Sequence, residues 1–561
     1  MEKRFVLTSG TGEEKADFRF GLLLNGNTIE AWQAETIRLL KEDGHQLVFV
    51  GINATCQKKG SLTDKLINYP YSRLLFRIWN RFIFKPSAKN PTNVTSLIAG
   101  ASVIPLNTTV KGSSTYFSDT DVSMVKSFAM DFILRFGFNI IRGSILDAAK
   151  FGIWSFHHDD EMKYRGGPPG FWEFMKKEAD NGVILQRLTN QLDKGVLLQK
   201  NWYPVIYHAY TAHLNQLYNE STKLPLQYCR QLQSGEVTET QSATKAKIYH
   251  PPGNLKMLHY AFLAVYRRIS FHLKDLLRQE DWHIGYEDFH DNPDCLSNDI
   301  FQKINRSSRT TYLADPFIIS HKGETYFFAE EFDYKKGKGK LVVAKKSEDF
   351  MEFYTILEDN HHYSFPFVFE NEGNLFVIPE CFESGEVKIY QFDTVSLKLS
   401  FVQTLLKGYA AVDPIVFRRD GRWWLLFTLK SMPSVHLYVF YAESLFGEYK
   451  PHFNNPVKSD IRAARNAGAA FVKGSKLFRP AQDCSAHYGR AVNICEITAL
   501  SENSFSEVIS KRIEPINRSG YSTGLHTYNF SESICVVDGK RYISTWYGFL
   551  HSLKKKISRR K

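Results

Sequence analysis

A short sequence pattern recurs in the second half of the chain, about once every fifty residues, and this repeat constrains the fold more than any other feature. Runs rich in Phe, Tyr, Val, Ile and Trp alternate there with turn residues. The five repeats start near Asp315-Pro316, Phe365-Pro366, Asp413-Pro414, Arg465-Asn466 and His526. Short antiparallel strands repeated in this way are typical of a β-propeller, in which each repeat forms one blade. We therefore expect an all-β, five-bladed propeller.

The first half has a different texture, in which strands alternate with helices. Residues 18–25 predict a buried strand, a helix with Trp32 follows, and residues 46–52 predict a second strand. The pattern resumes over residues 130–138 and 151–156. This order predicts a Rossmann-like α/β domain with a parallel, doubly wound sheet. The first turn lacks a Gly-x-Gly-x-x-Gly motif, so dinucleotide binding is not indicated.

The chain is long enough for several domains. At 561 residues it exceeds one ordinary core, and its 43% hydrophobic composition supports large globular interiors. Residues 233–246 are polar and rich in turn residues, as in a linker. We expect an α/β domain over residues 1–232, a linker and bridging helix over 233–300, the propeller over 301–550 and a basic tail over 551–561.

Within the bridging region, apolar residues recur at helical spacing over residues 255–278. Leu258, Phe262, Val265, Ile269 and Leu273 fall on one face. We expect a helix there that either closes the first domain or bridges to the second.

The number and spacing of the cysteines indicate the cellular compartment. The seven cysteines are scattered, odd in number and form no Cys-x-x-Cys pair. This pattern argues for reduced thiols in a cytoplasmic protein and against disulfides or structural zinc. No apolar run reaches the roughly 18 residues that a membrane-spanning helix needs, and no signal-type apolar core follows the first residues.

The net charge of +12 raises the question of an anionic partner, and part of it lies in the basic tail. Such a tail is usually just solvated. A weak contact with an anionic membrane surface is the alternative. Nucleic acid is not favoured, because the tail lacks the interleaved aromatic residues of a single-strand groove.

The chemistry-bearing motif of the first half is centred on His157. Ser155 precedes this histidine at the end of a predicted strand, a Tyr-Arg-Gly-Gly-Pro stretch follows at Tyr164, and Asp193 lies further on. An imidazole with a carboxylate in reach can stabilise an oxyanion and carry a proton. The alternative for His157 is a structural role at a strand end. A metal site is not expected, because the neighbouring His158 points to the opposite face of a strand.

These two segments resemble the active-site core of the folate-dependent formyltransferases, over residues 17–260. The resemblance implies formyl transfer from 10-formyltetrahydrofolate to an amino sugar or nucleotide-linked amino sugar, with His157, Asp193 and Ser155 as catalytic residues. The family has Asn where this chain has Ser155. That substitution leaves a slower enzyme, a donor recruited elsewhere, or a domain without the chemistry. The residues implied to wrap the pterin ring are Phe136, Gly137, Phe138, Asn139, Ile140 and Ile141.

The propeller region resembles furanosidase-type glycoside hydrolases and, more closely, the propeller-like domain of plant glucosamine inositolphosphorylceramide transferases. The Asp-Pro-Phe motif at Asp315 and the Arg-Pro-Ala-Gln-Asp motif at Arg479 carry this likeness. It implies axial carboxylates, but Pro366 occupies what we take as the second blade's Asp position. The propeller candidates are Asp315, Glu330, Glu380, Asp413, Arg465, Arg479 and His526.

The propeller candidates have two possible roles. The carboxylates suit glycoside chemistry, and the basic residues suit a phosphate or an acidic sugar. The structural alternatives are that the aspartates before proline are turn residues and that the basic residues form ion pairs between blades.

Taken together, the sequence favours a two-module enzyme that formylates a sugar amine and carries a propeller that binds or modifies a glycan or glycolipid. Two alternatives remain open. One is an inactive formyltransferase-like scaffold with a glycan-binding or glycosyl-transferring propeller. The other is a glycosyltransferase centred on the propeller.

Overall fold

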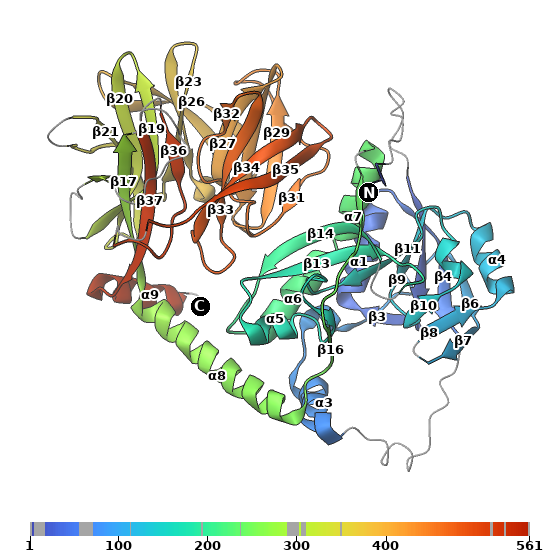
Figure 1. The fold of residues 1–561 in the computed structure, drawn as a ribbon. Coiled ribbons are helices and arrows are strands. Elements are labelled where there is room, and N and C mark those ends of the chain that lie inside the picture. The colour runs from blue at the N-terminus through green and yellow to red at the C-terminus, as the bar shows by residue number, and fades with distance from the viewer. Residues whose placement is uncertain are drawn as a thin grey trace. The chain divides into compact units, whose positions relative to one another are not determined.

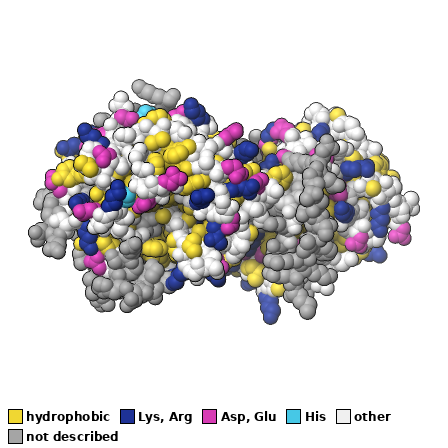
Figure 2. Space-filling view, turned by 90° about the horizontal axis from the view of Figure 1, so that it is seen from above, with side chains coloured by type: hydrophobic (Ala, Val, Ile, Leu, Met, Phe, Trp, Pro, Cys, Tyr) yellow, Lys and Arg dark blue, Asp and Glu magenta, His cyan; other side chains and the backbone are white. Residues whose placement is uncertain are grey.

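The computed structural model describes residues 3–4, 17–54, 71–112, 114–191, 195–235, 237–288, 302–304, 310–347, 351–516, 520–531 and 534–558. The chain divides into two compact units, residues 1–269 and residues 270–561 (Figure 1). The first unit is built on one large mixed sheet with helices, and the second on a series of antiparallel sheets. On the face drawn in Figure 2, Lys and Arg side chains are interspersed with Asp and Glu.

The first unit contains a nine-stranded sheet in the order β1-β15-β14-β13-β11-β9-β2-β4-β6. Its parallel strands are β2 (Arg19–Leu24), β4 (Gln46–Asn53), β6 (Ser102–Leu106), β9 (Phe132–Arg135) and β11 (Ile153–His157). The antiparallel edge has β13 (Asp180–Arg187), β14 (Val196–Pro204), β15 (Thr238–Gln241) and β1 (Lys3–Arg4). The parallel strands are mostly apolar because the sheet is covered on both faces.

Helices connect and cover these strands: α1 (Ala31–Glu42), α3 (Leu74–Ile78), α4 (Asp119–Ser127), α5 (Phe171–Lys176), α6 (Tyr210–Ser221) and α7 (Leu224–Ser234). Helix α8 (Asn254–Leu277) follows and contains the boundary between the two units. In α1, Trp32, Ile37 and Leu40 are buried at helical spacing, and Glu30 and Gln33 form a capping box at its start. Short one-turn helices lie at η1 (Tyr71–Arg73), η2 (Trp79–Ile83), η3 (Ser87–Lys89) and η4 (Ser144–Asp147).

Three small sheets complete the first unit. They pair β3 (Thr28–Glu30) with β5 (Pro91–Asn93), β7 (Thr108–Lys111) and β10 (Ile140–Arg142) with β8 (Ser114–Phe117), and β12 (Arg165–Gly166) with β16 (Ile248–Tyr249). The last two sheets place residues near the carboxyl end of β11.

The described residues of the second unit form five antiparallel sheets of short strands (Figure 1). The first has β19 (Thr311–His321), β20 (Glu324–Asp333), β21 (Lys338–Lys345) and β22 (Tyr354–Leu357). The second has β23 (Ser364–Asn371), β24 (Asn374–Glu380), β25 (Glu386–Asp393) and β26 (Lys398–Lys407). The third has β27 (Ala411–Arg419), β28 (Arg422–Leu429), β29 (His436–Ala442), β30 (Lys450–Pro451) and β31 (Lys458–Ser459).

The fourth sheet has β32 (Phe471–Lys473), β33 (Lys476–Asp483), β34 (Ala491–Leu500) and β35 (Phe505–Ile513). The fifth has β36 (Tyr528–Phe530), β37 (Ile534–Ile543), β17 (Gln279–Asp288) and β18 (Gln302–Lys303). Because β17 pairs with β37 along its whole length, the last blade combines both ends of the unit. The propeller therefore begins at residue 279, within the segment predicted as linker and bridging helix.

Hydrogen bonds between neighbouring inner segments join the five sheets into a closed ring. Going round, they are Phe365 N to Asp315 Oδ2 (3.1 Å), Asp413 N to Glu380 Oε2 (3.0 Å), Asn466 Nδ2 to the Asp413 carbonyl (2.7 Å), Tyr528 N to the Ala467 carbonyl (2.8 Å) and Asn529 Nδ2 to the Pro316 carbonyl (2.8 Å). The predicted five-bladed propeller is therefore the architecture of this unit.

A repeated bulge marks the inner strand of the first three blades. Asp315, Phe365 and Asp413 each precede a proline and have left-handed φ angles of 51°, 44° and 48°, and the strand register shifts at each site. The second blade's counterpart of Asp315 is therefore Phe365. Our placement of that position at Pro366 was wrong by one residue.

The segment predicted as a basic tail is largely helical. Helix α9 (Trp546–Ser558) covers most of it, and residues 559–561 lie outside the described residues. Of the helices that the structure describes, none has the length and apolar character needed to cross a membrane.

Candidate functional site

Carboxyl groups from several blades converge at the inner edge of the propeller. Asp315, Glu330, Glu380 and Asp413 are buried there, and Asp538 of β37 joins them. The charges of Asp315, Glu380 and Asp413 all act on Glu330, although they come from three blades. The structure thus brings together the four carboxyl residues that the sequence singled out.

His526 lies between two of these carboxylates. Its Nε2 is 3.0 Å from Asp315 Oδ1, its Nδ1 is 2.5 Å from Asp538 Oδ2, and its ring centroid lies 3.9 Å from that of Trp282. Burial disfavours the charged ring, but the two carboxylates outweigh it and raise the pKa of His526 to about 10. His526 is therefore an imidazolium at neutral pH. Although burial opposes ionisation, this cation and Arg465 lower the pKa of Asp315.

The second cation of the cluster is Arg465. Its guanidinium binds Asp413 through Nε (2.6 Å) and Nη2 (3.2 Å), and Gln482 Nε2 donates to the same carboxylate at 2.8 Å. The guanidinium lies 3.8 Å from Glu380 and 4.8 Å from the ring centroid of Tyr488. Burial and the charge of Asp413 raise the pKa of Glu380 well above its usual range. Asp413 is thus committed to a bidentate ion pair.

Glu330 differs from the other carboxyl groups of the cluster because one of its oxygens has no hydrogen-bond partner among the described residues. This oxygen, Oε1, is buried, and His362 Nε2 is 3.8 Å away. Burial and the charge of Asp315 raise the pKa of Glu330 well above its usual range, which favours the protonated form of its carboxyl. A Cβ at Gly339 would lie 2.1 Å from Oε1, so the glycine leaves room for this carboxyl.

A cavity of about 290 Å³ lies in the second unit, next to the first blade. Tyr312 and Phe332 form part of its wall, with ring centroids 4.9 Å apart. In the β19–β20 hairpin, Tyr312 pairs with Phe332 and Ala314 pairs with Glu330. Because side chains alternate along a strand, Glu330 projects from the same face as both rings. Arg278, Glu280, Tyr334 and Lys556 also line this cavity.

Arg479 does not belong to this site, contrary to the prediction. It is fully buried within the fourth blade, where its guanidinium donates to Glu507 at 2.5 and 3.1 Å and to the carbonyls of Ala463 and Ala464. Its charge is therefore satisfied inside the blade. Sequence reasoning also missed Asp538 and His362 as site residues.

Among the described residues, one group of side chains could hold a cation. Asp315, His526 and Asp538 offer ligand atoms that lie within 4.8 Å of one another. A metal would require neutral imidazole and would take only one of its nitrogens. Here each nitrogen faces a carboxylate, and the raised pKa of His526 favours a proton on both.

In the first unit, Ser155 and His157 line a cavity of about 730 Å³ near the carboxyl end of β11. They are two residues apart on the strand and so face the same side. Arg135 and Arg142 line this cavity too, and none of its described lining residues is Asp or Glu. Asp193, the predicted third catalytic residue, lies outside the described residues.

The segment predicted to wrap a pterin ring contributes little to this cavity. Only Ile140 and Ile141 of the six predicted residues line it. Phe136 stacks on Phe156, Gly137 packs closely against Asn25, and Phe138 and Asn139 have left-handed φ angles of 64° and 50°.

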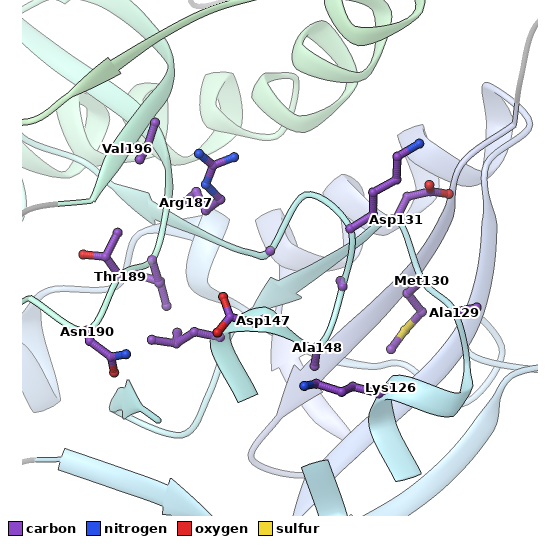
Figure 3. A pocket seen from close by; sticks show the side chains of 15 residues that line it. Lys126, Ala129, Met130, Asp131, Asp147, Ala148, Arg187, Thr189, Asn190 and Val196 are labelled. Atoms are coloured by element: carbon purple, nitrogen blue, oxygen red, sulfur yellow. The ribbon is translucent and has the colours of Figure 1, made fainter. Parts of the chain in front are cut away.

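A larger depression of about 1010 Å³ lies near the amino ends of β9 and β11, where Figure 3 shows Asp131, Asp147, Lys126 and Arg187 around it. Arg187 is already bound by Glu239 through contacts of 2.9 and 2.7 Å. Ligands of open α/β sheets bind at the carboxyl ends of the strands, so this depression is not the candidate site.

Comparisons with known proteins bear on the second unit. Residues 294–524 match the family model described as glucosamine inositolphosphorylceramide transferase 1, N-terminal. The Arabidopsis thaliana protein of that name is 29% identical over 258 residues, which cover 43% of this chain and 34% of that protein. The counterpart in Oryza sativa subsp. japonica is 29% identical over 208 residues, which cover 36% and 28%. The chain thus spans about a third of the length of the curated relatives that it matches.

Among solved structures, the catalytic domain of Coprinopsis cinerea GH62 alpha-L-arabinofuranosidase is 10% identical, with 43% of this chain and 95% of that chain covered at a TM-score of 0.34. A score at this level carries no argument, and the propeller assignment rests on the strand pairing and the ring of hydrogen bonds.

The prediction of a folate-dependent formyltransferase is wrong, because the matching family and relatives are transferases named for glucosamine and inositolphosphorylceramide. The 10-formyltetrahydrofolate donor, the amino-sugar acceptor and the formyl-transfer roles of His157, Asp193 and Ser155 fall with it. The sequence carried one sign against the resemblance, which is Ser155, because a serine hydroxyl reaches less far than the amide donor that the resemblance requires. The comparisons favour the propeller-centred alternative.

Proposed function

We propose that the propeller unit transfers a glycosyl group, acting at its axial cluster on the sugar headgroup of an inositol-phosphate lipid. The observation that carries this proposal is the contrast between Glu330 and Asp315. The surroundings raise the pKa of Glu330 well above its usual range and lower that of Asp315. A protonated carboxyl beside an ionised one is the pairing that glycosyl chemistry uses.

The roles follow from the charges that develop as a glycosyl bond breaks. The leaving oxygen becomes negative, and the protonated Glu330 donates a proton to it. The anomeric carbon becomes positive, and the ionised Asp315 stabilises that charge. The carboxylate of Glu330 then takes the proton of the incoming hydroxyl as the new bond forms. One C–O bond breaks, one forms, and Glu330 returns to its starting state.

The substrate class is supported by the cavity next to the first blade and by the relatives' name. Tyr312 and Phe332 offer flat apolar surfaces for a sugar ring, while Arg278 offers positive charge for a phosphate. Lys556, the other cation of the lining, is already paired with Asp275 of the same cavity. The matched family is named for a transferase of inositolphosphorylceramide. Together these features favour a phosphorylated sugar headgroup over a neutral glycan.

The test compares Glu330→Gln with Glu331→Gln in the full chain. Each protein is incubated with inositolphosphorylceramide and nucleotide-activated glucosamine, and glycosylated lipid is measured by mass. Glu331 is the matched control, because it is the next residue of β20, faces the other side of the sheet and lies 3.2 Å from Lys340. We expect Glu330→Gln to lower the rate roughly 10²- to 10⁴-fold, as for loss of a general acid, with little change in KM.

Two results would contradict the proposal. Turnover by Glu330→Gln within a few-fold of the parent chain would remove Glu330 from the chemistry. Equal losses in Glu330→Gln and Glu331→Gln, with matching losses of thermal stability, would show that the substitution acts through folding.

A further inference from the structure

Helix α8 carries an exposed apolar stripe along its whole length. Its members recur every three or four residues, which places them on one side of the helix. They are Leu255, Leu258, Phe262, Val265, Tyr266, Ile269, Leu273 and Leu277. Their exposure ranges from 48% at Leu277 to 84% at Leu255. Contiguous apolar surface of this extent is unusual on a soluble protein and marks an interaction site.

The side of α8 that packs against the rest of the first unit is not the side that carries the stripe. Met257 and Tyr260, on the other side of the helix, are buried, and the Tyr260 ring packs 5.3 Å from that of Phe171. Arg267 donates to the Phe174 carbonyl at 2.5 Å. The helix therefore uses a second, smaller face to attach to the first unit. The face that the sequence analysis expected to cover a domain points outward instead.

Positive charge accompanies the stripe. Lys256, Arg268 and Lys274 are exposed on α8, and the exposed Arg278 follows its last residue. None of them forms an ion pair with a carboxylate of the described residues. The helix contains one acidic residue, Asp275, whose carboxylate is neutralised by Lys556 at 3.0 Å.

We propose that α8 is a membrane-surface helix that docks on an anionic lipid bilayer. The stripe enters the boundary between headgroups and acyl chains, and Lys256, Arg268 and Lys274, which flank the stripe, contact lipid phosphates. The charge decides the occupant, since an apolar groove or a second copy of α8 would leave these cations without counter-charge. The proposal does not rest on glycosyl transfer.

Vesicle flotation of the full chain tests the proposal. The vesicles are phosphatidylcholine alone, or three parts phosphatidylcholine to one part phosphatidylserine. We expect binding to the anionic vesicles that weakens at high salt. The double variant Phe262→Glu/Ile269→Glu should bind at least tenfold less tightly. The variant Arg268→Gln/Lys274→Gln should lose roughly fivefold per residue, or about twenty-five-fold.

Phe401→Glu is the matched control, because Phe401 is 57% exposed on β26, far from α8 in the sequence, and resembles Ile269 at 55%. Its binding should equal that of the parent chain. Circular dichroism and thermal melting confirm that each variant folds. Absence of binding to anionic vesicles, or unchanged binding by Phe262→Glu/Ile269→Glu, overturns the proposal; the second result would assign adsorption to the basic tail.

Sedimentation without lipid tests whether a second copy of the chain, rather than a bilayer, covers the stripe. We expect the chain to sediment identically with and without Phe262→Glu/Ile269→Glu. A parent dimer that this variant dissociates would identify the stripe as a contact between copies and overturn the proposal. Bilayer depth gives a positive readout: brominated acyl chains should quench more of the fluorescence of Phe262→Trp than of the parent chain, and Phe401→Trp should show no such increase.

Discussion

The buried imidazolium of His526 makes the stability of the propeller depend on pH. Its pKa is raised from 6.5 to about 10 by Asp538 and Asp315, against the effect of burial. A raised pKa means that folding stabilises the protonated form, so this stabilisation is complete below pH 6.5 and is lost as pH rises to about 10. At about 1.4 kcal/mol per pH unit, this interval corresponds to roughly 5 kcal/mol.

Replacing His526 with Gln removes the cation and leaves Asp315 and Asp538 facing each other without it. Breaking a buried ion pair from one side typically costs about 3–5 kcal/mol. We therefore expect His526→Gln to be less stable than the parent chain by about that amount at pH 6, and the difference to shrink toward zero near pH 10. Glu330 and Glu380 also lose protons as pH rises, but both proteins share that effect and it largely cancels in the difference.

The assay is urea denaturation of both proteins across this pH range, followed by circular dichroism and tryptophan fluorescence. The two units are expected to unfold in separate transitions, so a single free energy would be meaningless for the whole chain. The transition of the first unit, which lacks His526, serves as an internal reference. A stability difference that stays constant from pH 6 to pH 10 would refute the assignment of His526 as an imidazolium.

Three further outcomes follow from particular contacts. Arg479→Met should destabilise the propeller by about 3 kcal/mol in the same assay, because it removes one of the two cations of the buried Glu507 and leaves Lys458, at 2.8 Å, as the other. Gly339→Ala should reduce glycosyl transfer as Glu330→Gln does, measured by lipid mass, because the new Cβ would collide with Glu330 Oε1. In the first unit, burial lowers the pKa of Arg135, which lines the cavity beside His157 without an acidic partner among the described residues. Phosphate should therefore raise the melting temperature of the parent chain and not of Arg135→Met.

The sequence repeat predicted the propeller, but it did not predict how the last blade is completed. The Asp-Pro steps at Asp315 and Asp413 recur because each inner strand has the same bulge. The closing strand Gln279–Asp288 has no such mark. Its partner Ile534–Ile543 lies at the far end of the unit, and a pairing over that sequence distance leaves no local signal. For this reason the predicted propeller boundary at residue 301 left this strand out of the propeller.

Site residues were predicted correctly where a suitable side chain also lies on an inner segment of its blade. Asp315 and His526 carry groups that suit an axial cluster and lie on inner segments. Arg479 has equally suitable chemistry, but its place in the fourth blade directs it into the interior, where Glu507 meets it. Asp538 was passed over because Asp-Gly usually indicates a turn, whereas here it lies inside β37.

The repeat also explains how one free acid can arise. Glu330 and Glu380 oppose Ala314 and Ser364 at equivalent positions of the first two blades, and Thr428 holds that position in the third.

The environments of the two glutamates differ because of the residues that the next blade contributes. Glu380 accepts the backbone N–H of Asp413 and lies 3.8 Å from Arg465, whereas the second blade has Phe365 at the position of Asp413 and so brings neither a carboxylate nor its arginine to Glu330. The pKa values of both glutamates are raised, but of the two only Glu330 has a buried oxygen without a hydrogen-bond partner among the described residues. The repeated scaffold thus distinguishes one glutamate where the next blade has Phe365 in place of an aspartate.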